Sequence, residues 1–186
     1  LPVAISRKDN RTIVTMKQAK PHFATPSATP REIALALNIG IDQLDTRFPL
    51  ALSNTANWHL MIAVSSKEAL DNINYDTAGL SHILSQAKAV TAHVFFDGGA
   101  GLFYARNFCP TIGIPEDPAT GAAAGAFAAY LANQRRLPEA VSELQIIQGE
   151  AMRRPSQITV RVESYDGEVK DLQVSGTAAL SFTLST

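Results

Sequence analysis

The sequence has a single cysteine, Cys109, among its 186 residues. One cysteine excludes a disulfide within the chain and leaves no clustered thiols for a metal ion. The chain also lacks any apolar run near the roughly 20 residues that a membrane-spanning helix needs. Its four histidines do not have the spacing of metal ligands, either to one another or to nearby carboxylates. These absences predict a protein without a metal site and without a membrane span.

An excess of charge of either sign is also missing. The sequence has sixteen Lys and Arg residues and seventeen Asp and Glu residues, and its formal net charge is −1. The basic residues are scattered, so the chain has no electrostatic surface for a nucleic acid or an anionic membrane. Nothing at its start has the charged and apolar regions of a signal peptide. We therefore expect a cytoplasmic protein whose partner is a small molecule or another protein.

What is present is a pattern of many strands and few helices, which predicts an α+β fold. Helix starts are indicated by the capping box Thr29 to Glu32, a second such pattern from Ser65 to Glu68, and Asp76 before a stretch with helical spacing. The turns Asp9-Asn10, Asp97-Gly98-Gly99 and Asp166-Gly167 separate β-branched and aromatic runs. Strands are expected at residues 2–5, 11–16, 48–52, 58–64, 91–96, 102–108, 144–148, 157–163, 169–175 and 177–184.

One segment, GIPEDPATGAAAGAF from residue 113 on, combines an acidic pair with a run of very small residues. Asp117 is a good N-cap and Pro118 suits the first helical position, so the longest helix is predicted to begin there. Gly121 and Ala122 would leave the first backbone N–H groups open, and such a helix end attracts a carboxylate or phosphate. The alternative is ordinary capping chemistry followed by close helix packing.

Several motifs together resemble one known family. Glu116-Asp117-Pro118-Ala119-Thr120-Gly121 is the most specific of them, and it follows Arg106-Asn107-Phe108-Cys109-Pro110. Thr55-Ala56-Asn57-Trp58-His59-Leu60, Gln148-Gly149, Arg154-Pro155-Ser156 and Val174-Ser175-Gly176-Thr177-Ala178 agree with it as well. These segments resemble the phenazine-biosynthesis PhzF-like isomerases, which are related in fold to diaminopimelate epimerase.

The resemblance implies a lobe in which a curved, mostly antiparallel sheet wraps around a central helix. It also implies a cofactor-free isomerase or epimerase that moves a proton on a small carboxylate-bearing substrate. In this sequence the implied catalytic residue is Asp117. The implied substrate-binding residues are Thr120, Gly121, Ala122, Ala56 and His59.

The resemblance is incomplete at the N-terminal side. Residues 1–40 resemble only a remnant hairpin and connecting helix of a first lobe, and residues 41–186 resemble the second lobe. The family's glutamate base belongs to the first lobe and has no counterpart here, and the chain begins Leu1-Pro2-Val3 without a methionine. Ala122 and Ala56 also replace a serine and a glycine of the family pattern. We therefore expect an isomerase present as its substrate-gripping C-terminal half.

Two alternatives stay open at this point. The chain could instead be a non-catalytic binding or assembly module that forms a homodimer through an exposed lobe face, because large bare apolar patches seldom persist on monomers. Individual residues also have two interpretations. His59 lies in an apolar run and could be a core side chain, while Cys109, between Phe108 and Pro110, is interpreted as buried packing.

Overall fold

A computed structural model describes residues 2–138 and 140–179, which form one eleven-stranded sheet with four α-helices. The strands are β1 (Val3–Lys8), β2 (Arg11–Lys17), β3 (His22–Ala24), β4 (Ala51–Asn54), β5 (Trp58–Ala63), β6 (Thr91–Gly99), β7 (Leu102–Cys109), β8 (Ile114–Asp117), β9 (Ala140–Gln148), β10 (Ser156–Tyr165) and β11 (Glu168–Ala178). The α-helices are α1 (Pro30–Leu37), α2 (Lys67–Asp71), α3 (Thr77–Gln86) and α4 (Gly121–Asn133), and the 3-10 helices are η1 (Ile41–Gln43) and η2 (Pro110–Ile112). No helix of the described residues is long and apolar enough to cross a membrane.

The sheet is mixed and open, in the order β1-β2-β11-β10-β9-β7-β6-β5-β4-β3, with β8 added beside β7. Two of its pairs, β5–β6 and β7–β9, are parallel. Parallel neighbours need a long crossover, and α2 with α3 supplies the first while α4 supplies the second. The predicted α+β class is confirmed. The hairpin β1–β2 continues this sheet by pairing with β11, and a domain boundary at residues 40 and 41 stays a prediction.

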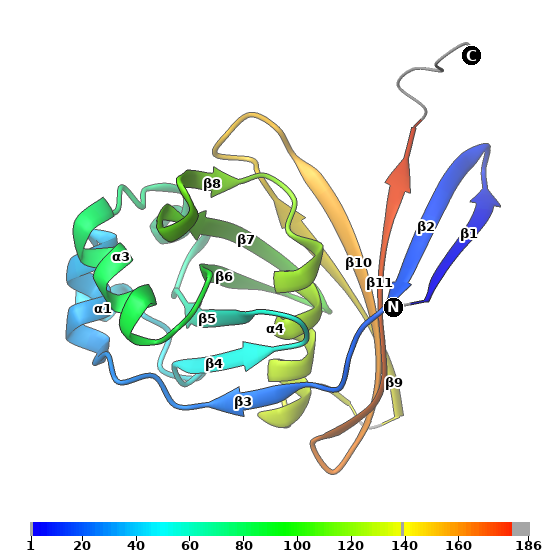
Figure 1. Ribbon diagram of the computed structural model, residues 1–186, viewed down its shortest axis with the longest axis horizontal. Coiled ribbons are helices and arrows are strands. Elements are labelled where there is room, and N and C mark those ends of the chain that lie inside the picture. Colours follow the sequence, from blue (N-terminus) through cyan, green and yellow to red (C-terminus); the bar gives the residue numbers. More distant parts are fainter. Residues whose placement is uncertain (1, 139, 180–186) are drawn as a thin grey trace.

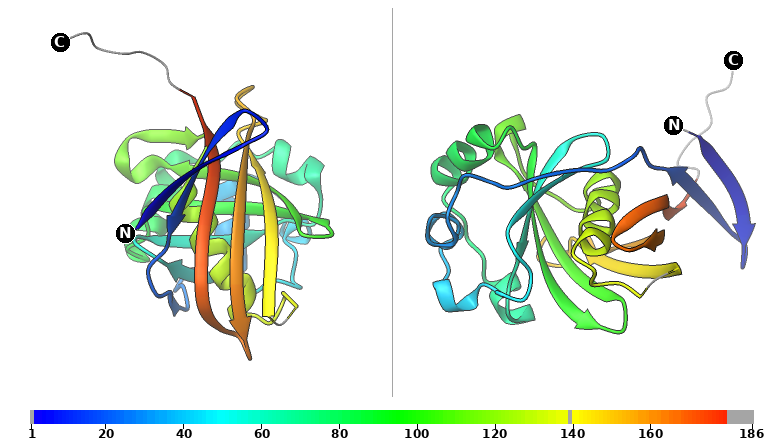
Figure 2. Two further views of the ribbon diagram at one scale, coloured as in Figure 1. Left: turned by 90° about the vertical axis from the view of Figure 1, so that its right-hand side faces the viewer. Right: turned by 90° about the horizontal axis from the view of Figure 1, so that it is seen from below.

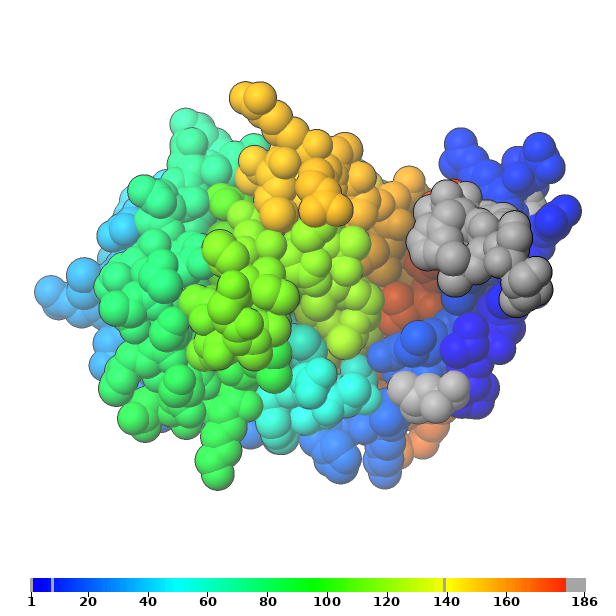
Figure 3. Space-filling model, turned by 45° about the horizontal axis from the view of Figure 1, so that its top comes forward, coloured from blue at the N-terminus to red at the C-terminus, as the bar shows by residue number. Residues whose placement is uncertain are grey.

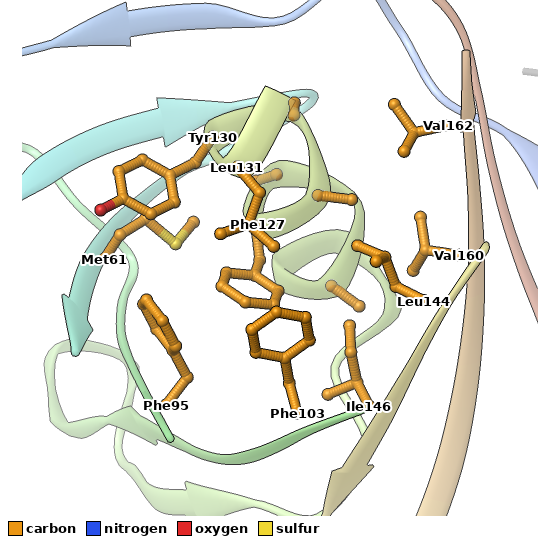
Figure 4. Close-up of a cluster of buried hydrophobic side chains, with 14 of the residues drawn as sticks. Met61, Phe95, Phe103, Phe127, Tyr130, Leu131, Leu144, Ile146, Val160 and Val162 are labelled. Carbon is orange, nitrogen blue, oxygen red and sulfur yellow. The ribbon is translucent and has the colours of Figure 1, made fainter. Parts of the chain in front are cut away.

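Helix α4 lies between the two ends of the sheet, with β4–β7 on one side and β9–β11 on the other (Figures 1 and 2). Every residue from Ala123 to Ala132 is buried, so the helix has no solvent-facing side. Phe127 packs among Phe95 and Phe103, and Leu144 and Val160 close the cluster from the other side (Figure 4). A helix enclosed in this way needs small residues, because strands must approach its backbone from several directions.

A second apolar layer covers the opposite face of β4–β7. Helices α1 and α3 lie there (Figure 1), and α2 adds Ala69 and Leu70 to the same cluster. The cluster is built around Ile33, Leu60, Leu80 and Val94, which are all fully buried. Strands β5 and β6 are therefore buried on both faces. Such strands have nearly continuous apolar runs, as residues 60–64 do.

Most of the predicted local signals are confirmed, with shifted boundaries. The capping box at Thr29 and the cap at Asp76 form as predicted, and the first hairpin turns at Asp9 and Asn10, both with positive φ. The second capping box at Ser65 is wrong by one residue, because the hydroxyl that accepts from Ala69 N is that of Ser66.

Three strand predictions also need correction. The expected strand at 48–52 begins at Ala51. The turn expected at Asp97-Gly98-Gly99 lies one step later, because β6 runs to Gly99 and the positive φ angles fall at Gly99, Ala100 and Gly101. The strand predicted at 177–184 does not start separately. Its first two residues continue β11, and residues 180–184 lie outside the described part of the chain.

The core beside α4 contains two histidines. His93 is fully buried against Phe127, with 5.3 Å between the ring centres, and His59 is 2% exposed. Burial lowers the pKa of His59 to about 4. Burial and the neighbouring His59 lower the pKa of His93 to about 3, although Asn107 lies near enough to favour the protonated ring slightly. Both rings are therefore neutral at pH 7.

We expect the free energy of unfolding to fall as the pH drops from about 6.5 toward 4. The unfolded chain takes up a proton on each histidine there, while the folded protein keeps both rings neutral, and each ring contributes a slope of about 1.4 kcal/mol per pH unit. Replacing His93 with Leu removes one contribution, so the loss between pH 6.5 and about pH 4.5 shrinks by about 2 kcal/mol. Urea unfolding at a series of pH values measures this difference.

The exposed His82 provides the control for this experiment. A His82→Gln variant keeps both buried rings, so its acid slope should match that of the unaltered chain. An H93L variant that loses stability in acid as steeply as the unaltered chain would contradict the assignment of the slope to His93.

Candidate functional site

The acidic pair Glu116 and Asp117 is divided between two tasks. Glu116 receives two hydrogen bonds from the Arg106 guanidinium, of 3.0 Å from Nε and 2.7 Å from Nη2. The remaining Arg106 nitrogen donates to the carbonyls of Leu70 and Asp71, the last two residues of α2, and of Ile73 just beyond it. Because both charged side chains are nearly buried, this bidentate pair ties β7 and β8 to the end of α2. Glu116 is thus part of the scaffold.

Asp117 instead faces the start of α4. Its Oδ2 accepts a 2.6 Å hydrogen bond from the Thr120 hydroxyl. Gln148, which is fully buried in β9, donates from Nε2 to the Asp117 carbonyl at 2.6 Å and to Thr120 Oγ1 at 3.0 Å. The two residues are therefore held together from both sides, and the Asp117 carboxylate has a fixed position beside the helix.

The predicted start of this helix is wrong by about three residues. Helix α4 begins at Gly121 with Thr120 as its N-cap, whereas Asp117 is the last residue of β8 and lies opposite Asn107. Asp117 ends a strand, and residues 118–120 that follow it are not helical, so Asp117 is too far from the first turn of α4 to be its N-cap. Its side chain fixes the Thr120 hydroxyl instead.

The first amides of α4 have no protein acceptor among the described residues. Thr120 makes no side-chain cap, and the first bond within the helix runs from Ala124 N to the Thr120 carbonyl at 3.0 Å. The N–H groups of Gly121 and Ala122 precede it. Both residues are only partly buried, so these donors and the positive end of the helix dipole remain available to an anion.

A pocket of about 460 Å³ opens at this helix end. Three of the predicted substrate-binding residues, Ala56, Gly121 and Ala122, line it together, although Ala56 comes from the loop between β4 and β5. Its other wall is apolar and comes from β2 and β11: Val14, Met16 and Val174. Small residues on one side and larger apolar residues on the other leave room for a compact molecule with an apolar part and a carboxylate.

Of the remaining predicted residues, Asp117 and Thr120 are not among those that line this pocket. Ala119, which directly precedes Thr120, lines both this pocket and an adjacent trough of about 930 Å³ along β10 and β11. Figure 3 shows β11, in red, between β10 in orange and the hairpin in blue. His59 does not line the pocket, because its ring is buried and its Nδ1 bonds to Thr91.

Two glutamines at the site were missed by the sequence analysis. Gln148 was part of a recognised motif, but nothing in its spacing indicates that it joins Asp117 to Thr120. Gln18 lines the pocket from the end of β2, and Thr55 donates to its Oε1 at 3.4 Å. The absence of a side chain at Gly125 makes room for it, since a Cβ there would lie 3.0 Å from Gln18 Cγ.

The residue after Gln148 has a steric reason to be glycine. Gly149 has φ +83°, and an added Cβ would lie 2.9 Å from the Pro118 carbonyl oxygen. That carbonyl also accepts a 2.8 Å hydrogen bond from the Ser156 hydroxyl. The approach of the loop after β9 to Pro118 thus fixes the segment between Asp117 and the helix.

The one thiol near the site is not a nucleophile at neutral pH. Burial, together with the nearby Asp117 carboxylate, raises the pKa of the Cys109 thiol to about 11. Within the described residues no three His, Cys, Asp or Glu side chains gather closely enough to hold a metal ion. The chemistry available at this helix end therefore rests on a carboxylate, a hydroxyl and backbone amides.

Comparison with known proteins identifies curated relatives. An uncharacterized isomerase of Deinococcus radiodurans is 34% identical over 81% of this chain and 49% of its own length. Trans-2,3-dihydro-3-hydroxyanthranilate isomerase of Pseudomonas aeruginosa is 30% identical over 96% of this chain and 61% of its own length. The chain therefore spans between about half and two thirds of the length of these relatives.

Solved structures also match this chain over only part of their own length. A PhzF-family phenazine biosynthesis protein of Bacillus anthracis matches 95% of this chain and 61% of its own, with a TM-score of 0.83 and 22% identity. A predicted epimerase of Pseudomonas aeruginosa matches with a TM-score of 0.76 and 25% identity, over 99% of this chain and 63% of its own. Residues 1–183 match the family described as phenazine biosynthesis-like protein, PhzC-PhzF. The chain belongs to this family.

Proposed function

We propose that this chain is the substrate-gripping part of a cofactor-independent isomerase or epimerase, built as a diaminopimelate epimerase-like lobe. The observation that carries the proposal is that the Asp117 carboxylate is bonded to Thr120, the N-cap directly before Gly121 and Ala122, whose open amides line a pocket. The amides bind the carboxylate of a small substrate, and Asp117 acts on the polar group or proton next to it. The names of the curated relatives, all isomerases, support this type of reaction.

The pocket favours a small substrate with one apolar face. Val14, Met16 and Val174 supply the apolar wall, and the amides lie on the opposite side with Ala56. Ala122 offers no hydroxyl, so the anion is bound by backbone donors and the helix dipole. A dihydroaromatic or short aliphatic carboxylate fits this division between an apolar and an anionic end.

Proton transfer at carbon needs an acid and a base on suitable sides of the substrate. Asp117 is one ionisable group at this helix end, and it is held by Thr120 and Gln148 on the α4 side of the pocket. We assign the second group to the part of the relatives that this chain does not match, which is between about a third and a half of their length. On this proposal, full turnover requires both parts.

Replacing Asp117 with Asn tests the role of the carboxylate. The chain, alone and joined to the unmatched part of the Pseudomonas aeruginosa relative, is incubated in D₂O with a panel of small carboxylates that includes trans-2,3-dihydro-3-hydroxyanthranilate. Deuterium incorporation at carbon, followed by NMR, should appear in the joined protein and fall by about 100-fold or more in D117N, because general acid–base catalysis contributes that much. Shifts of the Gly121 and Ala122 amide signals report binding separately from chemistry.

Glu116 provides a matched control in the same strand. Glu116→Gln removes a neighbouring carboxylate and weakens the bond to Arg106, so it should lower the melting temperature and leave deuterium incorporation within a few-fold. If D117N retains the incorporation rate of the unaltered protein, Asp117 is not the acid or base. If no carboxylate shifts the Gly121 and Ala122 amides, the anion site itself is wrong.

We also propose that this chain, taken alone, forms a homodimer through the hairpin. Val3, Ile5 and Met16 are 54%, 73% and 41% exposed, and the pairing Val3–Met16 puts them on one face with Val14. This apolar surface continues from the pocket wall to the edge strand β1. Contiguous apolar surface next to an unpaired strand edge favours association.

Sedimentation velocity over a range of concentrations tests this association. We expect a monomer–dimer equilibrium in the micromolar range that Ile5→Lys shifts to monomer, because a charge would then be buried in the interface. Leu35→Lys changes an equally exposed leucine on α1 and should leave the equilibrium as it was. A chain that stays monomeric at every concentration would show that the hairpin face does not pair with a second copy.

A further inference from the structure

A chain of buried polar side chains crosses three strands beneath the helix end. His59 Nδ1 lies 2.8 Å from the hydroxyl of Thr91, and that hydroxyl donates to Asn107 Oδ1 at 2.9 Å. Asn107 Nδ2 then contacts Cys109 Sγ at 3.4 Å. The first three side chains are at most 3% exposed. A continuous polar chain in an otherwise apolar core needs an explanation, because every unmade hydrogen bond there costs stability.

The direction of the hydrogen bonds fixes the state of His59. A threonine hydroxyl has one hydrogen, and Thr91 gives it to Asn107, so Thr91 accepts from His59. The neutral His59 ring must then carry its proton on Nδ1 and leave Nε2 as a bare acceptor. Nε2 is buried and has no partner among the described residues. The tautomer of His59 is thus selected by its contact with Thr91, which in turn bonds to Asn107, the residue opposite Asp117.

The polar chain ends at the strand that holds Asp117. Asn107 lies opposite Asp117 in the β7–β8 ladder, and the register is interrupted by a bulge between Phe108 and Cys109. Strand β8 has four residues and, within the described chain, pairs with β7 alone. Because β8 bonds to one strand, any movement of β7 also moves β8. The position of Asp117 therefore depends on how firmly the end of β7 is fixed.

We propose that His59, Thr91 and Asn107 are positioning residues that hold the end of β7, and through it β8, so that Asp117 stays beside the amides of α4. The hydrogen-bond chain connects β5, β6 and β7 on the face toward α4, where an apolar core alone would allow small sliding movements. This proposal rests on the proposed function only for the consequence that misplacing Asp117 slows the reaction. The structural claim can be tested without any substrate.

Thr91→Val is the main test, because it keeps the shape of the side chain and deletes the hydroxyl. It leaves His59 Nδ1–H and Asn107 Oδ1 without partners. We expect amide hydrogen exchange in the β7–β8 ladder, measured by NMR at the amides of β7 and β8 that are protected in the unaltered protein, to become about tenfold faster or more, relative to the change elsewhere in the protein. Thr91→Ser restores the hydroxyl and should return these rates to within about twofold of the original.

Tyr130→Phe is the matched control. It also removes one buried hydroxyl without changing the shape of the side chain, but the lost bond goes to the Pro49 carbonyl near the other end of α4. The exchange rates of this variant in the β7–β8 ladder should stay within about twofold of those of the unaltered protein. If Thr91→Val speeds the exchange of this ladder no more than Y130F does, the proposal is overturned.

A second measurement does not depend on any variant folding. The ¹⁵N NMR spectrum of the unaltered protein should show His59 protonated at Nδ1 and unprotonated at Nε2 at neutral pH. The opposite tautomer would break the inferred hydrogen-bond direction and overturn the proposal.

In the joined protein, Thr91→Val should lower kcat by about tenfold with little change in KM, because Asp117 is displaced while the amides are not. A variant with faster exchange and unchanged kcat would overturn the positioning role. Failure of the proposed function itself would appear separately, as a D117N variant of undiminished activity.

Discussion

Full enclosure of helix α4 is the constraint on which the rest of the structure depends. Its residues from Ala123 to Ala132 have no solvent face, because strands from both ends of the sheet pack against it. A helix in that position has room for few large side chains, here Phe127, Tyr130 and Leu131, and the small residues at its start leave its first amides uncovered. The proposed anion site and the packing of the core thus have one cause. A bulkier helix would have lost both.

Enclosure also explains the polar groups beside the helix. Near the middle of α4, the Ser53 hydroxyl donates to the Ala126 carbonyl and the His93 ring lies against Phe127. His59, Thr91 and Asn107 are bonded to one another in the strands beside it, and all five of these polar residues are buried. Burial keeps both histidine rings neutral, so no charge accumulates under the positive end of the helix dipole. The charges of Glu116 and Arg106 offset each other, and Asp117 adds a carboxylate next to the N-cap Thr120.

Local chemistry predicts local structure well in this protein. The cap at Thr29, the cap at Asp76 and the turn at Asp9 and Asn10 are read from three or four neighbouring residues, and all form as expected. The start of α4 was misplaced because the same local rules favour Asp117 as a cap, while β7, ten residues earlier, holds it in a strand. Gln148 bonds to Asp117 from 31 residues away, and Gln18 lines the pocket together with Gly121, which is about 100 residues further along the chain. No spacing in the sequence can indicate a contact of that kind.

The acidic pair shows how one strand serves two tasks at once. Side chains alternate across a strand, so Glu116 and Asp117 must point to opposite sides. Arg106 neutralises the carboxylate of Glu116, and its guanidinium also donates to three carbonyls near the end of α2. Among the described residues, the carboxylate of Asp117 accepts only from the Thr120 hydroxyl and, at 3.5 Å, from the Ala119 amide. The bond from Thr120, and the bonds from Gln148 to Thr120 and to the Asp117 carbonyl, give this carboxylate a defined position without a salt bridge in the described part of the chain. A carboxylate that is fixed but not neutralised is the form that can still accept a proton or bind a cationic group, which is why the two acids are not interchangeable despite being neighbours.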